Sequence, residues 1–579
     1  MKKFLLVCIS ILLTSNFAMA QKKVIDLRIL ETSDVHGSFF PYNFISRKPD
    51  RGSLASVSTY VKDLRKKYGN NVIVLENGDI LQGQPTNYYY NFEHPEKENI
   101  AAQVINYIGY DAQTFGNHDV ETGHAVYDKW VKELNCPTIC ANMVDAKTGV
   151  PYVKPYIIIE REGVRIAILG MITPAIPNWL NESLWSGLHF EEMVSCAKYW
   201  VEYIKKHEGA HVIAGLFHSG REGGITTDSY VEDASLKVAE EVDGFDIVFY
   251  GHDHFSHNEI IKNKYTGRDV LCIDPSCNAH LLSDVSVSIT MEDGKMTDKK
   301  IKGELANMDI VPADQDYMNH FAGVIEEMKN YVGRKIGEFK TPMYSRDCFF
   351  GTSAFTDFIH DVQLQLTGAD ISFNAPLMFN TTIAAGPVYV SDMFKLYKYE
   401  NMVYVLELTG EEVRKHLELS YDLWVNTMKD KEDHIMLLDN NYKGDLQRFG
   451  FKNLTFNFDS AAGIDYEVDV TKPDGEKVRI LRMSDGKPFD EKKIYRVAMN
   501  SYRGNGGGEL LTRGAGIPLE KIKELIVYQS ERDQRYYLMK EIEKKGVMTP
   551  KAHNNWRFVP EKWTKNAIKR DKELIFGKK

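Results

Sequence analysis

The chain has 579 residues, of which 43% are hydrophobic, and it carries 71 Lys and Arg against 81 Asp and Glu, a formal net charge of −10. This chain is longer than those that usually fold around a single hydrophobic core, so we expect two or more domains. The composition is typical of globular proteins and excludes a disordered, fibrous or polytopic chain. The negative charge argues against polymeric nucleic acid as a partner, because such binding neutralises many phosphates.

The N-terminal segment has the order of an export signal. Two lysines precede an apolar run over residues 4–13, and residues 18–20 have the Ala-x-Ala form that signal peptidase cleaves. We therefore expect residues 1–20 to be a signal peptide and the mature protein to be exported to the periplasm. No apolar stretch is long enough to span a bilayer, so we expect no membrane anchor.

Six of the seven cysteines lie beyond this signal. Export permits disulfides. Cys136 and Cys140, or Cys272 and Cys277, are close enough to pair, although spacing alone does not fix connectivity. A zinc cage is the alternative use of such pairs. We disfavour it because the chain has no Cys-x-x-Cys spacing and offers better metal ligands elsewhere.

The hydrophobic pattern divides the chain into four parts beyond the signal. From residue 24 to about 289, short apolar runs alternate with amphipathic stretches, which is typical of a layered α/β domain. An apolar stripe at helical spacing then predicts a separate helix near 312–332, and strand and helix signals restart after it. The predicted parts are a first domain over 21–311, a linker helix over 312–334, a second α/β domain over 335–552 and a peripheral segment over 553–579.

In the first domain, Asp, Asn and His residues follow directly after predicted strands. Five strand ends carry such residues. In an open α/β sheet, ligands bind at the carboxyl ends of the strands, so we expect these side chains to share one site. The five segments are Asp34-Val35-His36, Gly78-Asp79, Gly116-Asn117-His118-Asp119, His218 and Gly251-His252-Asp253-His254.

These residue types suit a pair of divalent metal ions. Asp34 and His36 are two positions apart, so an extended chain would point both side chains the same way, and His252 and His254 repeat this spacing. Asp79 is the natural bridging carboxylate. Mixed imidazole, carboxylate and amide ligands suit Zn, Mn, Fe or Co rather than thiolate chemistry. Two such ions roughly 3.5–4 Å apart would clamp phosphoryl oxygens.

Taken together, the five segments resemble the signature of the calcineurin-like metallophosphoesterases. The resemblance narrows to the exported 5′-nucleotidase and 2′,3′-cyclic-nucleotide 2′-phosphodiesterase/3′-nucleotidase family and covers nearly the whole mature chain. It implies a two-sheet αββα metallophosphoesterase sandwich, a linking helix and a C-terminal mixed α/β domain that binds the substrate. It also implies the metal ligands: Asp34, His36, Asp79 and His254 for one ion, and Asp79, Asn117, His218 and His252 for the other.

By the same resemblance, His118 would not bind metal. It would steady the phosphoryl group or protonate the departing oxygen. A neighbouring acid should orient its ring. Relatives often have Asp three residues after this His, whereas this chain has Glu121 there and Asp119 next to the His. The orienting acid is therefore open between the two, and we favour Asp119 slightly.

The second domain has aromatic residues beside glycine-rich turns, where stacking on a base contributes about 1–3 kcal/mol. The segment 456–459, Phe-Asn-Phe-Asp, precedes one such turn, and Tyr502 precedes the glycines of 504–508. Core packing is the alternative for both. The stretch Asn-Ala-Pro-Leu at 374–377 resembles the cyclic-phosphodiesterase/3′-nucleotidase branch. That branch implies that Phe458 and Tyr502 sandwich the base.

We therefore expect a monomeric dimetal phosphoesterase acting on small nucleotides. It would hydrolyse 2′,3′-cyclic nucleotides to 3′-nucleotides and then to nucleoside and phosphate. The nearest alternative is a 5′-nucleotidase or nucleotide-sugar hydrolase with the same metal site. An exported nucleotide- or metal-binding protein without turnover is a second possibility. A phosphoesterase for a different substrate, such as a phospholipid head group, is a third.

Overall fold

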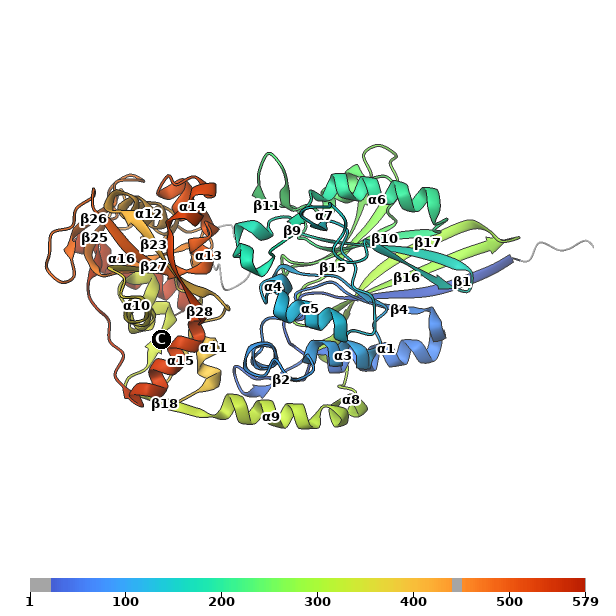
Figure 1. Ribbon diagram of the computed structural model, residues 1–579, viewed down its shortest axis with the longest axis horizontal. Helices are drawn as coiled ribbons and strands as arrows, with labels where there is room; N and C mark the ends of the chain where they lie inside the picture. Colours follow the sequence, from blue (N-terminus) through green and yellow to red (C-terminus); the bar gives the residue numbers. More distant parts are fainter. Residues whose placement is uncertain (1–21, 440–449, 578–579) are drawn as a thin grey trace, which may run out of the picture.

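The computed structural model describes residues 22–439 and 450–577, so the expected signal peptide over 1–20 lies outside the described residues. The first domain contains two stacked sheets (Figure 1). The first sheet has the strand order β17 (Lys295–Asn307), β16 (Leu281–Glu292), β1 (Lys22–Thr32), β4 (Val72–Glu76) and β5 (Ala112–Gln113). The second has the order β14 (Ser256–Lys262), β15 (Asp269–Pro275), β13 (Ile247–Tyr250), β10 (Val212–His218), β8 (Val164–Ile172) and β7 (Tyr156–Arg161).

Alternation along the strands builds four layers. In β1, Leu27 and Ile29 face the second sheet, whereas Leu30 faces the helices outside the first sheet. In β10, Leu216 faces the first sheet and Phe217 faces the opposite helices. Each of these strands thus buries both faces. The outer helices are α1 (Leu54–Tyr68), α3 (Ile100–Ile108) and α5 (His124–Glu133) on one side and α6 (Met193–His207) and α7 (Ser235–Glu241) on the other, which confirms the αββα prediction.

The predicted linker helix consists of two helices, α8 (Gln315–His320) and α9 (Ala322–Gly333), which run along the lower side of Figure 1 toward the second domain. Asp314 caps α8 by accepting hydrogen bonds from the main-chain N–H groups of Asp316 and Tyr317. The apolar stripe of α9 packs against the core of the first domain. We propose that the predicted boundaries at 311 and 335 hold, and we call residues 22–311 the first domain. The second domain is taken as 335–577, because residues beyond 552 contribute to its core.

The second domain is a mixed α/β structure. Its main sheet has the order β24 (Ser460–Ala462), β20 (Ile371–Asn374), β27 (Ile494–Asn500), β23 (Met402–Thr409) and β28 (Ile526–Asp533). A second sheet contains β26 (Val478–Met483), β25 (Ile464–Asp469) and β30 (Trp556–Val559), and a third contains β22 (Gly386–Tyr389), β18 (Lys335–Phe339) and β29 (Val547–Met548). The helices that cover them include α10 (Ala354–Thr367), α11 (Val390–Leu396), α12 (Gly410–Trp424), α15 (Gln534–Lys545) and α16 (Glu561–Phe576).

Two sequence expectations change at this level. The segment after residue 552 is not peripheral, because its Trp556 and Ile575 are buried in the core of the second domain. The six described cysteines are all free thiols, so neither candidate disulfide is present in the part of the chain that the structure describes. Four of them are buried, where they pack as small apolar side chains.

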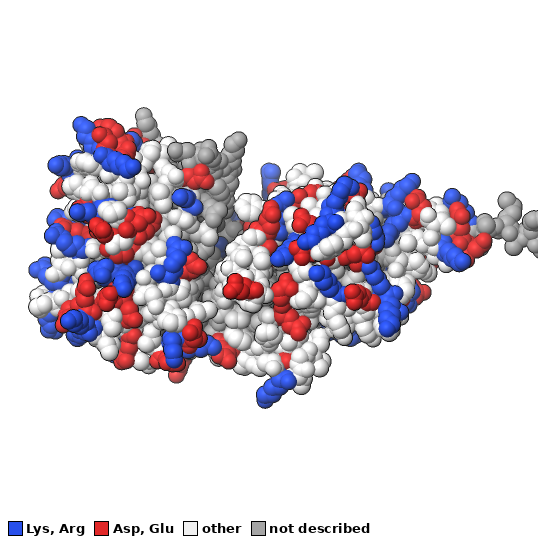
Figure 2. Space-filling view, turned by 90° about the horizontal axis from the view of Figure 1, so that it is seen from above, with Lys and Arg blue, Asp and Glu red and all other residues white. Residues whose placement is uncertain are grey.

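The outer surface carries mixed charge. On the face shown in Figure 2, acidic and basic side chains are interspersed over both domains. Within residues 22–439 and 450–577, no helix has the length and hydrophobicity needed to cross a bilayer.

Candidate metal centre

The candidate ligands of the first domain gather where the strands end. Parallel pairing joins β1 to β4 in one sheet and β10 to β13 in the other, so the carboxyl ends within each pair lie at one edge of their sheet. The two edges meet, because Asn77 after β4 donates to the carbonyl of Phe217 in β10. Asp34 follows β1, Asp79 follows β4, His218 ends β10 and His252 follows β13. Asn117 begins the short helix α4 (Asn117–Val120), which follows β5.

The loops that present the ligands have an unusual backbone. Asp34, His36, Asp79, His252 and His254 all have positive φ, between 48° and 85°. Side chains other than glycine rarely adopt this region, and such residues concentrate at functional sites. The expected extended geometry of the Asp-x-His and His-x-His pairs is therefore wrong. Tight left-handed turns, rather than extended chain, direct both members of each pair into the site.

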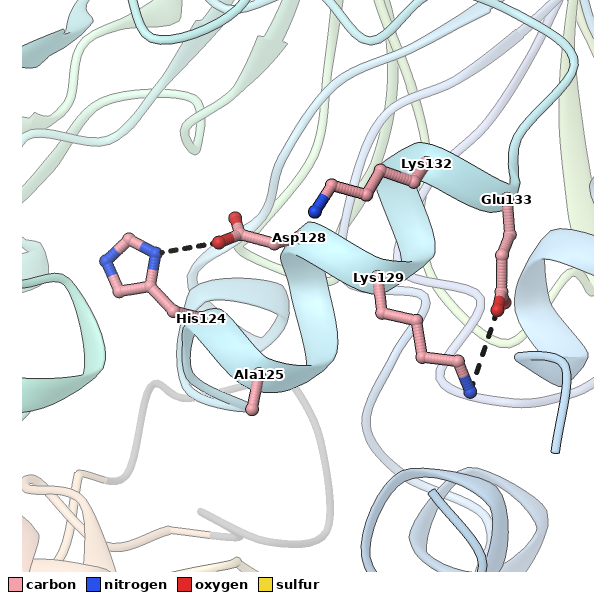
Figure 3. A pocket seen from close by; sticks show the side chains of 6 residues that line it. All are labelled: His124, Ala125, Asp128, Lys129, Lys132 and Glu133. Atoms are coloured by element: carbon pink, nitrogen blue, oxygen red, sulfur yellow. Dashed lines mark hydrogen bonds and ion pairs between the residues drawn. The ribbon is translucent and has the colours of Figure 1, made fainter. Parts of the chain in front are cut away.

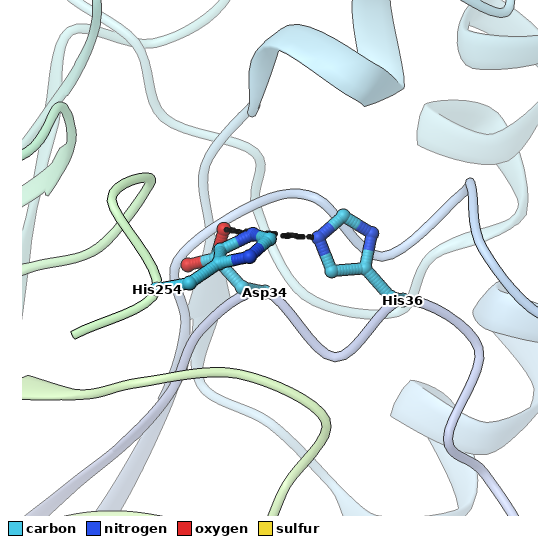
Figure 4. A group of neighbouring side chains, drawn as sticks. All are labelled: Asp34, His36 and His254. Atoms are coloured by element: carbon cyan, nitrogen blue, oxygen red, sulfur yellow. Dashed lines mark hydrogen bonds and ion pairs between the residues drawn. The ribbon is translucent and has the colours of Figure 1, made fainter. Parts of the chain in front are cut away.

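The structure brings the ligands into two adjacent clusters. In one, the ligand atoms of Asp34, His36 and His254 all lie within 4.8 Å of one another, and Figure 4 shows their side chains converging. In the other, the same holds for Asp79, His218 and His252. Asn117, which was also predicted to bind the second ion, lies beside this cluster. Its Oδ1 is 3.2 Å from His218 Nε2.

Asp79 lies between the two clusters. Its Oδ2 is 3.3 Å from His218 Nε2 in one cluster and 4.0 Å from His36 Nε2 in the other. Both distances match a carboxylate that can serve two neighbouring cations. Oδ1 of Asp34 is buried and lies 3.3 Å from His254 Nε2, but no described donor meets it with hydrogen-bonding geometry. A buried carboxylate oxygen without a donor is costly unless a cation faces it.

The histidines present acceptor nitrogens to this space. His36 Nδ1 lies 3.2 Å from the carbonyl of Gln82, and His218 Nδ1 lies 2.7 Å from the carbonyl of Asn77. Since each ring donates Nδ1–H to a carbonyl, its Nε2 faces inward, toward the other ligands, and carries the lone pair whenever the ring is neutral. This arrangement of outer acceptor and inner lone pair is typical of metal-binding histidines. The residues present therefore fit a divalent cation in each cluster.

His252 is oriented the other way round, with Nε2 bound to Glu232. The Oε1 atom of Glu232 lies 3.1 Å from His252 Nε2, which leaves His252 Nδ1 as the ring atom available to a cation. The other oxygen of Glu232 accepts the N–H of Ile225 at 2.6 Å, within the hairpin of β11 (Gly223–Thr226) and β12 (Val231–Asp233). Sequence reasoning missed Glu232, because it lies in no motif and is brought to His252 only by the hairpin.

The charges of the site also favour a cation. Burial alone would raise the pKa of Asp34 and Asp79, but the neighbouring His218 outweighs burial and holds the pKa of both carboxyls below the ordinary range. Burial and His254 lower the pKa of His36 to about 3, so its imidazole is neutral. Burial opposes protonation of His218, yet Asp79 and Asp34 raise its pKa to about 9, so at neutral pH its Nε2 holds a proton that a bound cation would replace. The site thus holds a negative potential that favours positive charge.

Glu121, rather than the favoured Asp119, orients His118. The Nδ1 atom of His118 lies 2.5 Å from Glu121 Oε2, one helical turn away. Asp119 points elsewhere. Its carboxylate accepts four main-chain N–H groups, from Asp79, Ile80, Leu81 and Gly116, at 2.8–3.0 Å. Asp119 therefore shapes the loop that carries Asp79, and it has no acceptor atom left for His118.

The structure places the two predicted base-binding residues, Phe458 and Tyr502, in different surroundings. Phe458 is fully buried and stacks on Trp424 with ring centroids 5.4 Å apart and an interplanar angle of 6°. It belongs to the core and cannot contact a ligand. Phe456, two residues earlier, is partly exposed, and its ring meets that of Tyr502 edge to face at 6.1 Å. Phe456 and Tyr502 are thus the aromatic pair that this surface offers.

Arg503 holds the two aromatic segments together. Its guanidinium binds both oxygens of Asp459 at 2.9 and 3.1 Å and donates to the carbonyl of Phe456 at 3.0 Å. Gly507 lies against the neighbouring ring, since a Cβ there would come within 2.6 Å of Tyr502. The spacing of the aromatic pair is therefore fixed by a buried ion pair and a glycine.

A separate hollow of about 500 Å³ lies over α5 and contains none of the candidate ligands (Figure 3). Its side chains pair with one another: His124 with Asp128 at 3.2 Å, and Lys129 with Glu133 at 3.6 Å. We assign no chemistry to it.

Comparison with known proteins agrees with this architecture. Residues 27–256 match the family model of calcineurin-like phosphoesterases, and residues 335–513 match that of the 5′-nucleotidase C-terminal domain. Together with the four-layer fold and the clustered ligands, these matches define a metal-dependent phosphoric ester hydrolase. The chain belongs to the calcineurin-like phosphoesterases that carry a 5′-nucleotidase C-terminal domain.

Similar proteins cover the chain over most of its length. It is 27% identical to the 2′,3′-cyclic-nucleotide 2′-phosphodiesterase/3′-nucleotidase of Haemophilus influenzae, over 94% of this chain and 89% of that protein. It is 26% identical to the trifunctional nucleotide phosphoesterase YfkN of Bacillus subtilis over 93% of this chain, which spans 39% of that longer protein. A 5′-nucleotidase precursor from Thermus thermophilus shares the fold, with a TM-score of 0.62, 20% identity and coverage of 93% and 100% of the two chains.

Proposed function

We propose that this chain hydrolyses 2′,3′-cyclic nucleotides to 3′-nucleotides, and these to nucleoside and phosphate. The single observation that carries the proposal is that Asp79 stands between two clusters of imidazole and carboxylate ligands. The similarity to cyclic-nucleotide phosphodiesterases supports the choice of substrate. We propose that the protein acts in the periplasm as a monomer after loss of residues 1–20.

The ligand assignment is part of the proposal. Bound here, two divalent cations would polarise the phosphoryl group and offset the charge on its oxygens. One would be held by Asp34, His36, Asp79 and His254, and the other by Asp79, Asn117, His218 and His252. Zn, Mn, Fe and Co all accept this mixture of ligands.

His118 supplies the proton in this proposal. The carboxylates of Asp79 and Glu121 outweigh the effect of burial and raise the pKa of His118 to about 10, so its imidazole is protonated at neutral pH. Water adds to phosphorus and releases a proton to solvent as the bond to the 2′ oxygen breaks, and His118 donates its proton to that oxygen. His118 then regains a proton from solvent. In the second hydrolysis, the same proton transfer serves the 3′ oxygen.

The second domain would hold the base. The rings of Phe456 and Tyr502 are edge to face, so a base that stacks between them requires one ring to turn. Their stacking contributes affinity without hydrogen-bonded readout, which suits an enzyme that accepts several bases.

A substrate panel tests the proposal. We expect phosphate release from 2′,3′-cyclic AMP (with added phosphomonoesterase) and from 3′-AMP at rates well above those for 5′-AMP, in protein loaded with Mn or Zn. Asp79→Ala should abolish all three rates, while Asp298→Ala, at an exposed carboxylate of β17, should change none. Preference for 5′-AMP would favour the 5′-nucleotidase alternative. Absence of release from every nucleotide would overturn the proposal.

A further inference from the structure

A segment of the second domain reaches the general acid candidate of the first. Residues 397–401, which we call the 397–401 strap, follow α11 and precede β23. The ring of Tyr399 in this strap lies nearly parallel to the His118 imidazole, with an interplanar angle of 6° and ring centroids 6.1 Å apart. The two residues are far apart in sequence, so this contact exists only because the domains meet here.

The strap is held in place by a buried guanidinium. Arg535, at the start of α15, is 2% exposed. It donates to the carbonyls of Tyr397 and Lys398 at 3.0 and 2.6 Å and to Glu400 Oε1 at 2.8 Å. Three hydrogen bonds from one rigid fork leave the strap little freedom. Tyr399 is therefore presented by an ordered segment rather than by a mobile loop.

The same arginine lies at the domain junction. Its guanidinium stacks over the ring of Phe394 at 4.1 Å and over the ring of Tyr88, a first-domain residue, at 5.0 Å. The hydroxyl of Tyr88 in turn donates to Asp533 Oδ2 at 2.8 Å. The anchor of the strap is thus fixed relative to the first domain as well as the second.

Two further described residues contact the His118 ring. Glu121 binds Nδ1, and the ring of His36 meets it edge on at a centroid distance of 5.6 Å. The side chain of His118 is 23% exposed. A hydrogen bond at one nitrogen fixes a point on the ring but permits rotation about the axis through that bond. A flat partner on one face removes that rotation.

We propose that Tyr399 is a positioning residue for His118, which holds the imidazole from the second domain in the plane needed to protonate the leaving oxygen. This inference rests on the proposed phosphoesterase function. It assigns the second domain a part in the chemical step in addition to holding the base. Tyr399 acts through His118 and need not touch the substrate.

Kinetics with two kinds of leaving group test the proposal. Misplacement of a catalytic group costs about 10- to 100-fold in rate, so we expect Tyr399→Leu to lose that much in kcat on 3′-AMP with KM nearly unchanged. On a p-nitrophenyl phosphate ester, whose leaving group needs no proton, the loss should be less than about threefold. Tyr399→Phe, which keeps the ring, should retain activity, as should Tyr265→Leu, a control at an exposed tyrosine.

Three results would overturn the proposal: equal losses on both leaving groups, a loss confined to KM, or a Tyr399→Phe variant as impaired as Tyr399→Leu. The first two would indicate disturbed folding or a direct substrate contact. The third would assign the effect to the phenol hydroxyl instead of the ring face.

A measurement independent of turnover separates this inference from the proposed function. In histidine-labelled protein, a stacked ring shifts the imidazole NMR signal of His118, which His118→Asn identifies by its loss. We expect Tyr399→Leu to move that signal and Tyr399→Phe to leave it within the range of Tyr265→Leu. An unmoved signal in Tyr399→Leu overturns the inference even if the enzyme is active. Inactive wild-type protein with the expected shift would reject the proposed function alone.

Discussion

In the first domain, every candidate ligand predicted from the sequence lies in one of two neighbouring clusters or beside them, whereas in the second domain one of the two predicted base-binding rings is in the core. The ligands follow buried strands whose ends meet at one edge, so their position along the chain decides their position in space. Phe458, the predicted ring that is buried, directly follows a 3-10 turn over Thr455–Asn457, which contains Phe456. There, neighbouring side chains point in different directions, and Phe456 faces out while Phe458 faces in.

This difference shows where sequence patterns carry positional information. A strand end has a fixed direction and fixed neighbours, so its polar residues can be assigned to a site from the order of the elements. A short irregular turn has neither property. An aromatic motif in such a turn predicts that a ring faces the ligand but not which one.

The largest expected effect concerns His118, the proposed proton donor. General acid catalysis contributes about 10²- to 10⁴-fold, so His118→Ala should lower kcat on 3′-AMP by that factor. Glu121→Gln keeps a hydrogen-bonding partner but removes its charge, and should cost less. Steady-state kinetics on metal-loaded protein gives both numbers. The control is His124→Ala, at a histidine of α5 outside the site. Equal rates for wild type and His118→Ala would exclude this residue as the acid.

The two phenylalanines of the turn offer a direct contrast. Loss of one stacked ring costs about 1–3 kcal/mol, or about 5- to 150-fold in affinity, so Phe456→Ala should raise KM for nucleotides by that factor. Phe458→Ala leaves a cavity beside Trp424 and should lower the free energy of unfolding by about 3–5 kcal/mol. Denaturant unfolding and kinetics on both variants test the pair. If Phe458→Ala raises KM while its stability is unchanged, our correction is wrong.

The hairpin carboxylate should affect metal binding. Partners that orient a metal-ligating histidine contribute about 10- to 100-fold in metal affinity, so Glu232→Gln should weaken binding by that factor. Competition titration of metal-depleted protein with a chelating dye measures the change. Glu222→Gln, at an exposed carboxylate of the same region, is the matched control. Identical affinities for the two variants would show that Glu232 does not support His252.

The smallest expected effect concerns a buried histidine of the second domain. In the second domain, His360 faces the hydroxyls of Ser372 and Ser460, and burial lowers its pKa to about 3. Its folded pKa lies below the unfolded value of about 6.5, so protonation favours the unfolded chain. The stability linked to neutral His360 is complete above about pH 6.5 and is lost as the pH falls toward 3.

We therefore expect His360→Gln to lose less of its unfolding temperature than wild type between about pH 7 and about pH 5. Thermal unfolding followed by circular dichroism measures this difference. His189→Gln, at an exposed histidine, should follow wild type. A His360→Gln variant with the acid sensitivity of wild type would show that this ring does not titrate between the two states.

Much of the fold follows from the sequence, because alternating apolar runs specify strands that are covered on both faces. The break at Phe321 between α8 and α9 and the burial of Trp556 do not, since they depend on packing between distant segments. In the site, residue type and order predict the ligands. Their left-handed backbone could not be predicted, because the spacing of Asp34 and His36 is equally compatible with an extended chain.

The remaining contacts of the site are of two kinds. Some join residues that are distant in the sequence, and one depends on which of two nearby acids faces His118. Tyr399 reaches His118 from the other domain, and Glu232 reaches His252 from a hairpin without a motif. Glu121 and Asp119 are both acids near His118, and only helical geometry separates their roles. The sequence contains no signal for the Tyr399 and Glu232 contacts, and for His118 it narrows the choice to two acids without deciding between them.

The four hydrogen bonds accepted by Asp119 have a mechanical consequence. Asp119 binds the N–H of Asp79, and the N–H of His118 binds Asp79 Oδ1 at 2.8 Å, so the two loops close a ring of interactions. A thermal displacement of one loop must carry the other with it. The separation between His118 and Asp79 therefore stays nearly constant while the surrounding chain fluctuates, and the two residues behave as one moving part.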